Sequence, residues 1–297
     1  PTRHGRYCRL AALFRPLPPY TENAGSSVGG NNVTRTVPAF FGTGEDEYQT
    51  ARRRFTEEMT STVSTLRSLA SNVDAAEAPR EVAGLVSHYP FDDARSASAV
   101  DVMNGNDGRI ADVGFEAEGK EGRGFRFDGG DDGIRIPHVA RDSFTISFWV
   151  RTSAQCRGKD NDPLWFLGDG LVDGEVSGVV NDLGISMIGS GIISAGIGNP
   201  ETFVNSPPGF NDGEWHHVAL TRNHEDGVIT LYVDGIEVGR ATGGKQTLDR
   251  IDELAVGRML PGHGAFNGDL DELKIHDRAL TAGEVAGAAH GLRLDEP

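Results

Sequence analysis

The spacing of apolar side chains divides the chain into two unequal parts. Between residues 45 and 73, apolar residues recur at alternating steps of three and four, from Tyr48 to Val73. This spacing places them along one side of an amphipathic helix of about eight turns. After residue 84 the period falls to two, which is the period of strands with one buried face.

Alternating apolar and polar residues predict strands between residues 85 and 280. The alternation is clearest at 144–150, 215–221 and 228–233. Further strands are expected at 85–91, 123–128, 133–136, 163–168, 184–189, 192–197, 252–258 and 268–276. Asp-Gly and Asn-Gly steps between these segments are typical of tight turns, and we expect glycine turns at 168–170 and 189–191 as well. Many short strands with little helix predict an all-β fold, a two-sheet antiparallel jelly-roll sandwich with an N-terminal amphipathic helix.

These patterns divide the chain into five segments. Residues 1–44, rich in Pro, Gly and Ser, are expected to be a flexible tail, and 45–73 the long helix, followed by a linker over 74–84. The jelly roll covers 85–280, and 281–297 form a short C-terminal helix and tail. Thr281 and Glu284 have the spacing of a capping box at the start of that helix, and Gly291 can end it.

The acidic character of the chain is confined to the predicted sandwich. The 297 residues include 28 basic and 44 acidic side chains, a formal net charge of −16. Residues 85–277 account for 16 − 32 = −16, whereas residues 1–84 carry 10 − 9 = +1. A net acidic chain is a poor match for phosphate backbones, so nucleic acid is not an expected partner. No apolar run approaches the roughly 20 residues needed to cross a bilayer, so we expect no membrane span.

Three groups of residues resemble one known family. The first is the opening strand, 85–92, which ends in Tyr-Pro-Phe-Asp and is followed by Asp101 and the Asn-Gly-Asn turn at 104–106. The second runs from 124 to 150, and the third combines 213–219, 231–235 and 268–280. In this order, across about 200 residues, they resemble the laminin-G-like, concanavalin A-like lectin and glucanase jelly-roll domains. The resemblance implies a sandwich whose first and last strands lie side by side.

The opening residues resemble a different module. Residues 7–14 are similar to the end of a module found in large planctomycete cytochrome-associated proteins. Together with the missing initial Met, this similarity implies that the chain is a fragment of a larger bacterial multidomain protein.

One acidic side chain is expected inside the predicted sandwich. Period-2 alternation puts Asp271 on the same face of its strand as Leu273 and Ile275. If those two residues face the core, Asp271 lies at its inner edge. A buried carboxylate needs a partner, which is either a set of backbone N–H groups or a hard cation.

Further oxygen ligands lie near the predicted first strand. Family members often hold calcium where the first and last strands meet, and Ca²⁺ takes six to eight oxygen ligands. The resemblance therefore implies a calcium site at Asp92, Asp101, Asn106 and Asp271. The alternative is that these side chains cap turns through bonds to the backbone.

The resemblance implies a non-catalytic binding module, with carbohydrate as the ligand class. Retaining glycoside hydrolases need two carboxylates about 5 Å apart, and in this fold these come from a Glu-x-Asp-x-Glu strand. No such triplet occurs on a predicted strand, so we do not expect an enzyme. A structural or protein-protein adhesion module and a glycoside-active enzyme are the alternatives.

A sugar site typically combines an exposed aromatic platform with a few polar groups. Trp165, Phe203 and Phe210 lie in or near variable connections and are the candidates, whereas Trp149 and Trp215 lie in alternating strands and are expected in the core. We expect a polysaccharide or other glycan as partner, with a protein as the alternative. The resemblance further implies an extracytoplasmic location, in the periplasm, secreted or at the cell surface.

Overall fold

The computed structural model describes residues 20–21, 36–37, 83–92, 98–111, 116–178 and 180–291. The helix expected at 45–73 lies outside the described residues, as do most of the tail and the linker. Two short strands near the N-terminus, β1 (Tyr20–Thr21) and β2 (Thr36–Val37), pair with each other in antiparallel fashion. The remaining strands form two larger sheets.

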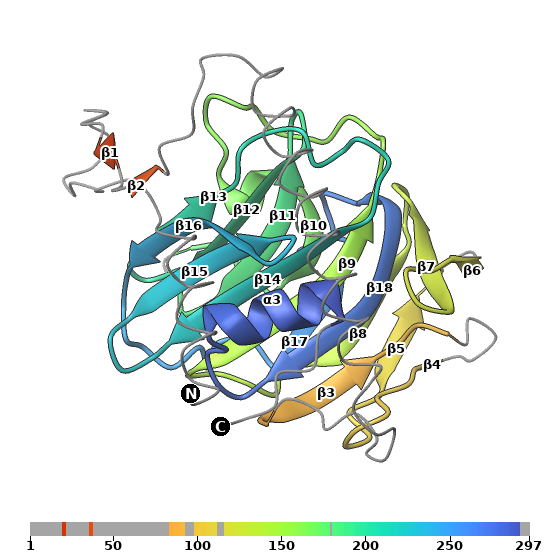
Figure 1. The fold of residues 1–297 in the computed structure, drawn as a ribbon, viewed down its shortest axis with the longest axis horizontal. Coiled ribbons are helices and arrows are strands. Elements are labelled where there is room, and N and C mark those ends of the chain that lie inside the picture. The colour runs from red at the N-terminus through yellow and green to blue at the C-terminus, as the bar shows by residue number, and fades with distance from the viewer. Residues whose placement is uncertain are drawn as a thin grey trace, which may run out of the picture.

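The described residues from 83 onward form a two-sheet antiparallel sandwich, as the sequence predicts (Figure 1). Sheet I has the order β13 (Thr202–Asn205), β12 (Ile192–Ile197), β11 (Leu183–Ile188), β10 (Asp169–Asp173), β17 (Glu253–Val256), β8 (Gly133–Pro137), β5 (Gly108–Ala111), β4 (Ser98–Ala99). Sheet II has the order β16 (Ile236–Thr242), β15 (Val228–Val233), β14 (His216–Asn223), β9 (Phe144–Arg151), β18 (Asn267–His276), β7 (Arg123–Asp128), β6 (Glu116–Glu118), with β3 (Leu85–Tyr89) also paired to β18.

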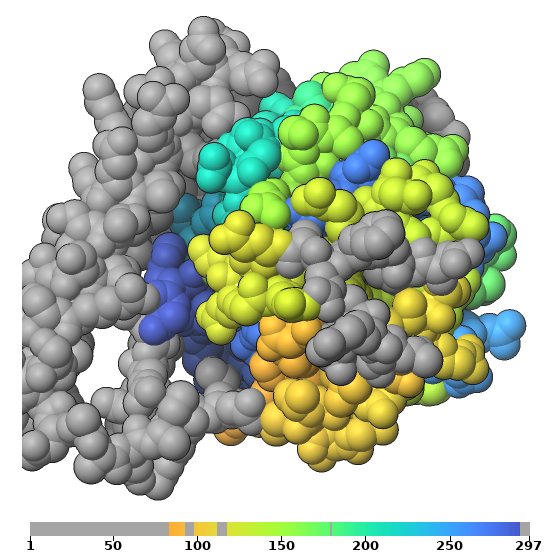
Figure 2. Space-filling model, turned by 90° about the vertical axis from the view of Figure 1, so that its right-hand side faces the viewer, coloured from red at the N-terminus to blue at the C-terminus, as the bar shows by residue number. Residues whose placement is uncertain are grey.

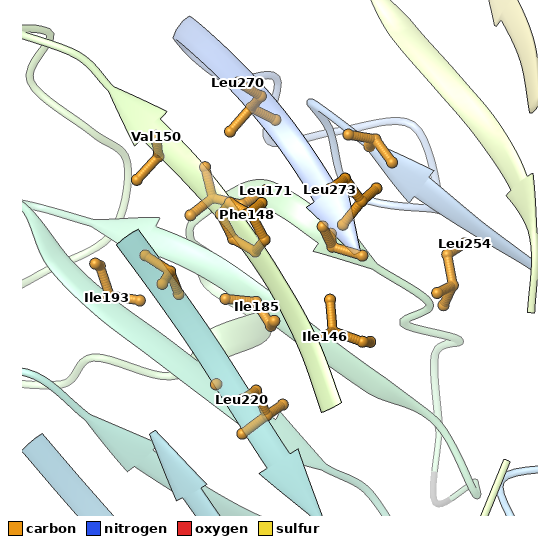
Figure 3. Close-up of a cluster of buried hydrophobic side chains, with 14 of the residues drawn as sticks. Ile146, Phe148, Val150, Leu171, Ile185, Ile193, Leu220, Leu254, Leu270 and Leu273 are labelled. Carbon is orange, nitrogen blue, oxygen red and sulfur yellow. The ribbon is translucent and has the colours of Figure 1, made fainter. Parts of the chain in front are cut away.

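Apolar side chains from the inner faces of the two sheets form one core. Ile146, Phe148 and Val150 of β9 lie in one cluster with Leu171 of β10 and Ile185 of β11 (Figure 3). Each of the five is at most 1% exposed. Because burying one such side chain contributes about 1.5–3 kcal/mol, these residues stabilise the face-to-face packing of the two sheets.

Strand β18 lies inside sheet II and has neighbours on both edges. One edge pairs with β9, while the other pairs first with β7 and then with β3. The first and last strands of the sandwich therefore lie side by side, as the family resemblance implies. Figure 2 looks onto this edge of the molecule, where the orange surface of β3 lies beside the yellow surfaces that follow it in the chain.

The alternation predicted for β18 is wrong at one point. Leu270 and Leu273 both belong to the core, three positions apart, because the register with β9 shifts between Asp271 and Lys274. Within the shift, Glu272 has a φ of 53°, in the left-handed region that non-glycine residues rarely adopt. Asp271 pairs with Trp149 and faces away from the core, whereas Leu273 faces it.

The C-terminal helix α3 (Ala282–His290) lies across the outer face of sheet II (Figure 1). Thr281 and Glu284 form the predicted capping box, and Gly291 ends the helix with a φ of 61°. Val285 packs with Ala219 and Tyr232 of the sheet. In the described part of the chain, no helix combines the length and the apolar character needed to cross a bilayer.

The strand expected at 163–168 is wrong. The segment contains a 3₁₀ helix, η1 (Trp165–Leu167), because its residues cover the outer face of sheet I instead of pairing with it. Trp165 is 1% exposed, and the hydroxyl of Ser186 donates to its carbonyl at 2.5 Å. The turn expected at 168–170 is also wrong in part, since Asp169 and Gly170 begin β10.

Small residues on β11 and β12 make room for the indole of Trp165. A Cβ atom added at Gly184 would lie 2.5 Å from ring atom Cε3, and one added at Gly196 would overlap the ring as well. The hydroxyl of Ser194 donates to the carbonyl of Pro163 at 3.1 Å, which fixes the start of the same segment. The outer face of this part of sheet I is thus closed by the chain itself.

Several buried ionisable groups are shifted by their surroundings. Burial raises the pKa of Asp173 to about 7, of Asp182 to about 6 and of Asp271 to about 7. Burial opposes protonation of His216, but hydrogen bonds to Asp212 at 3.0 Å and Asp234 at 2.9 Å outweigh it and raise the pKa to about 9.

Two further histidines are shifted in the opposite direction. Burial lowers the pKa of His217 and of His276 to about 4, so both rings are neutral at pH 7. They are 4% exposed and lie in β14 and β18. Acidification must therefore charge two buried rings.

Replacing Gly196 by Val is expected to destabilise the fold by about 1–3 kcal/mol, because the new side chain overlaps the Trp165 ring. Urea unfolding followed by tryptophan fluorescence measures the change. Thr242→Val, a β-branched replacement at an exposed position of β16, is the control and should change stability by less than about 0.5 kcal/mol. Equal midpoints for the two variants would contradict the packing described for Trp165.

The buried acids and histidines make opposite contributions to the pH dependence of the free energy of unfolding. The raised pKa values of Asp173 and Asp271 give stability that is lost as the pH rises from about 4 to about 7, because the folded state holds these protons more tightly. The raised pKa of His216 gives stability that is lost from about pH 6.5 to about pH 9, so a net decline is expected above pH 7. The lowered values of His217 and His276 give stability that is lost as the pH falls from about 6.5 toward 4.

Asp173→Asn tests this pH dependence. Between about pH 4 and 7 the variant should remove up to about 1.4 kcal/mol per pH unit of stability loss, the contribution of one titrating group, and above pH 7 it should leave the slope unchanged. Asp252→Asn, which removes the same charge from a side chain that is 91% exposed, should leave the profile unchanged. Parallel profiles for Asp173→Asn and the unmodified chain would rule out a raised pKa at this residue.

Candidate ligand-binding site

A row of charged and aromatic side chains crosses the outer face of sheet II. Arg126 of β7, Asp269 of β18 and Arg151 of β9 occupy directly paired positions in neighbouring strands. The residues next to them in sequence, on β7, β9 and β18, include members of the core, so the three polar side chains point outward. Trp215, just before β14, continues the row, with its ring centroid 4.6 Å from the guanidinium carbon of Arg151.

Asp269 is held between the two guanidinium groups. Its side chain is 3% exposed. Nε and Nη2 of Arg126 donate to its two oxygens at 2.7 and 3.0 Å, and Nε of Arg151 donates to Oδ2 at 2.9 Å. Such charge-assisted bonds offset the cost of burying the carboxylate, and the contact with Asp269 in turn raises the pKa of Arg126.

A pocket of about 410 Å³ opens beside this row. Its volume lies in the range of small-molecule sites. It is lined by Arg126, Arg151, Thr152, Ser153, Ala154, Gly213, Asn267, Gly268 and Asp269. Guanidinium, hydroxyl, amide and peptide groups thus line one cavity, which suits a ligand rich in hydroxyl groups. The charged lining residues sum to 2 − 1 = +1, in a chain whose net charge is −16.

A second row lies two residues further along the same strands. Asp271, Trp149 and His217 occupy paired positions, and the Nζ atom of Lys120 lies 4.1 Å from the centroid of the Trp149 ring. The expectation that Trp149 is buried is confirmed, since its side chain is 9% exposed, although it lies on the outer face beneath Lys120. The same expectation is wrong for Trp215, which is only half-buried.

The four residues expected to hold calcium fall into two pairs. Asp101 and Asn106 share one turn, in which the backbone N–H of Asn106 donates to Asp101 at 3.0 Å. Asp92 and Asp271 both bind the segment that joins β6 to β7. The N–H of Arg123 donates to Asp92 at 2.8 Å, and the N–H of Lys120 donates to Asp271 at 2.7 Å.

The two pairs are held by hydrogen bonds from the backbone. Asp101 accepts N–H groups from His88, Met103, Asn104 and Asn106; burial opposes its ionisation, but these bonds lower its pKa. Asp271 accepts three backbone N–H groups. Among the described residues, no group of three or more His, Cys, Asp or Glu side chains is arranged to hold a metal ion. The arrangement is that of acids bonded to turns, the alternative stated from the sequence.

The three aromatic candidates differ in exposure. Trp165 is 1% and Phe210 2% exposed, so the expectation that they present a platform to solvent is wrong. The indole N–H of Trp165 donates to Glu201, and Phe210 packs edge-on against His216 with ring centroids 5.1 Å apart. Phe203 on β13 is half-buried, away from the pocket lining.

The pocket residues were missed at the sequence level, although a signal for them exists. Arg126 and Asp269 lie within predicted strands and Arg151 directly follows one, at positions that alternate with apolar ones. Alternation shows that each faces outward. Only the order of the strands, with β18 between β7 and β9, shows that the three meet.

Comparison with known proteins identifies one family model and several partial relatives. Residues 128–286 match the model of the concanavalin A-like lectin/glucanases superfamily. Neuronal pentraxin-2 of Cavia porcellus is 27% identical over 158 residues, which cover 50% of this chain and 34% of the pentraxin. Neuronal pentraxin-1 of Rattus norvegicus is 34% identical over 89 residues, 27% of this chain and 20% of that protein. The matched regions thus span about a third or less of these relatives.

Solved structures share the fold at lower sequence identity. Domain 4 of AbnA, a GH43 extracellular arabinanase from Geobacillus stearothermophilus in complex with arabinotriose, has a TM-score of 0.52 and 22% identity, covering 70% of this chain and all of that domain. The binding domain of Paraclostridial Mosquitocidal Protein 1 has a TM-score of 0.53 and 16% identity, covering 69% of this chain and 52% of that one.

The family match covers residues 128–286, more than half of the 297 residues, and the sandwich topology agrees with it. The chain therefore belongs to the concanavalin A-like lectin/glucanases superfamily.

Proposed function

We propose that the chain is a non-catalytic carbohydrate-binding module whose ligand enters the pocket beside Arg151. The observation that carries the proposal is the lining of that pocket. Thr152, Ser153, Asn267 and the two arginines surround about 410 Å³ with groups that hydrogen-bond to hydroxyls. Trp215 lies against Arg151 at the side of the pocket and is half-buried, so part of its ring is available to a sugar.

The chemistry of the pocket supports binding over hydrolysis. Asp269 is the one carboxylate among the lining residues, and both of its oxygens are bonded to guanidinium groups. Glycoside hydrolysis of the usual kind needs a pair of carboxylates, one of which gives up a proton. A neighbour of the same fold is in complex with arabinotriose, which supports an oligosaccharide as ligand.

The setting that fits this function is a secreted or surface multidomain protein. The matched arabinanase is extracellular by its name, and its domain covers 70% of this chain. We keep a protein-protein adhesion module as the alternative, because one neighbouring binding domain is found with rat synaptotagmin II.

Affinity electrophoresis and pull-down with a panel of polysaccharides test the proposal. We expect at least one glycan class to retain the protein, and Asn267→Ala to weaken retention roughly five-fold through the loss of about one hydrogen bond. Asn161→Ala, at an exposed asparagine outside the pocket lining, is the matched control and should bind normally. A folded protein that no glycan retains, but that captures a protein ligand, would favour the adhesion module instead.

Calcium stabilisation is a separate expectation from the family resemblance, and the binding proposal does not require it. Melting curves recorded with millimolar calcium and with a chelator test this expectation, because an ion that binds only to the folded state raises the melting temperature. Support would be a rise that Asp92→Asn abolishes, Asp92 being the exposed member of the expected set. Identical melting curves with calcium and with chelator would contradict a calcium site at Asp92, Asp101, Asn106 and Asp271, whose oxygens would then be used in their hydrogen bonds alone.

A further inference from the structure

The pocket beside Arg151 has a charge opposite to that of the chain. Its lining carries two guanidinium groups and one carboxylate, while the chain as a whole has a formal charge of −16. A neutral sugar needs no net positive charge in its site. The one excess positive charge of the pocket lining therefore favours a ligand that carries a negative charge.

The guanidinium groups retain donors for a ligand. Arg126 bonds Asp269 through Nε and Nη2. Arg151 contacts Asp269 through both Nε and Nη2, and its Nη2 also donates to the carbonyl of Glu118 at 3.1 Å. In the part of the chain that the structure describes, the Nη1 group of neither arginine is used in a hydrogen bond. The side chain of Arg126 is 56% exposed and that of Arg151 27%, so a ligand can reach both.

Asp269 fixes both guanidinium planes before any ligand arrives. Its side chain is 3% exposed and accepts bonds from two different strands, so the cations are held at the pocket wall instead of moving freely in solvent. Pre-ordered donors lower the entropy cost of binding. Planar guanidinium groups match the two oxygens of a carboxylate better than an ammonium does.

We propose that the pocket binds the carboxylate of an acidic saccharide, a uronate unit of the glycan, with Arg126 and Arg151 as the residues that select it. This inference rests on the proposed carbohydrate binding. It adds a ligand class that fold and family membership leave open. Thr152, Ser153 and Asn267 then meet the hydroxyl groups of the same sugar ring.

The net negative charge of the chain opposes non-specific binding of acidic polysaccharides. A chain of net charge −16 repels polyanions, so retention by a uronate polymer cannot come from general attraction. The experiment is affinity electrophoresis in gels containing polygalacturonate, alginate or glucuronoxylan. The neutral counterparts are fully methyl-esterified polygalacturonate, dextran and arabinan, and dextran sulfate distinguishes sulfate from carboxylate.

We expect retention by at least one uronate polymer, at least about ten-fold weaker binding to a neutral counterpart, and loss of retention as salt is raised. Arg126→Gln should weaken uronate binding about ten-fold, because Asp269 keeps Arg151 as partner and the fold persists. Arg240→Gln removes the same charge from an exposed pair with Glu237 on β16 and should have no effect.

Asp269→Asn tests the ordering of the two guanidinium groups. It removes the carboxylate that holds both of them, so uronate binding should weaken in a variant whose melting curve shows it to be folded, although the formal charge of the pocket lining rises from +1 to +2. Equal retention by neutral and uronate polymers, insensitive to Arg126→Gln, would overturn this inference and leave carbohydrate binding standing. Retention by dextran sulfate alone would replace carboxylate by sulfate and overturn it too. If no glycan of either kind is retained, the proposed function itself fails.

Discussion

The sandwich depends on the pairing of β18, the one strand of sheet II with three partner strands. Along one edge it follows β9, and along the other it passes from β7 to β3. The exchange of partners takes place where the register shifts, between Asp271 and Lys274. Glu272 lies inside this shift, and its carboxylate is bonded to His88 at 2.9 Å and to Lys274 at 2.7 Å. A side chain that joins β18 to β3 thus holds the irregular residue in place.

This break in β18 separates two kinds of surface on sheet II. Before it, Asp269 faces outward between two arginines and helps to form the pocket. At the break, Asp271 binds the backbone of the segment that joins β6 to β7. Beyond it, the outer face is covered in part by α3. The polar site therefore lies where the sheet is neither covered by the helix nor interrupted by the bulge.

Much of the fold could be predicted from periodicity, and the failures have identifiable causes. Strands such as β9, β14 and β15 show a clear period of two in the sequence, and the structure buries both of their faces. β10 was missed because Asp169, Gly170 and Asp173 have the composition of a turn, although the strand is buried on both faces. A strand was predicted at 163–168 because a segment that packs on the face of a sheet needs the same apolar residue types as a strand that pairs within the sheet.

The site was less accessible to sequence reasoning than the fold. Sequence identifies a carboxylate but does not show what its oxygens bind, and at Asp101 and Asp271 backbone N–H groups fill that role. For the pocket, the decisive information is strand order, because residues 126, 151 and 269 are far apart in the chain and meet only through pairing. Asp101 and Asp271 are thus used in local bonds to the backbone, while the pocket lining carries a charge opposite to that of the chain.

The three tryptophans occupy three different environments, which gives the protein built-in optical reporters. Trp165 is 1% exposed and lies on the glycines of sheet I, so its emission follows the integrity of the sandwich. Trp149 is covered and lies beneath the Lys120 ammonium. Trp215 is half-buried beside Arg151, and a soluble quencher reaches it before the others. Occupation of the pocket and unfolding of the sheets can therefore be distinguished within one spectrum, without any label.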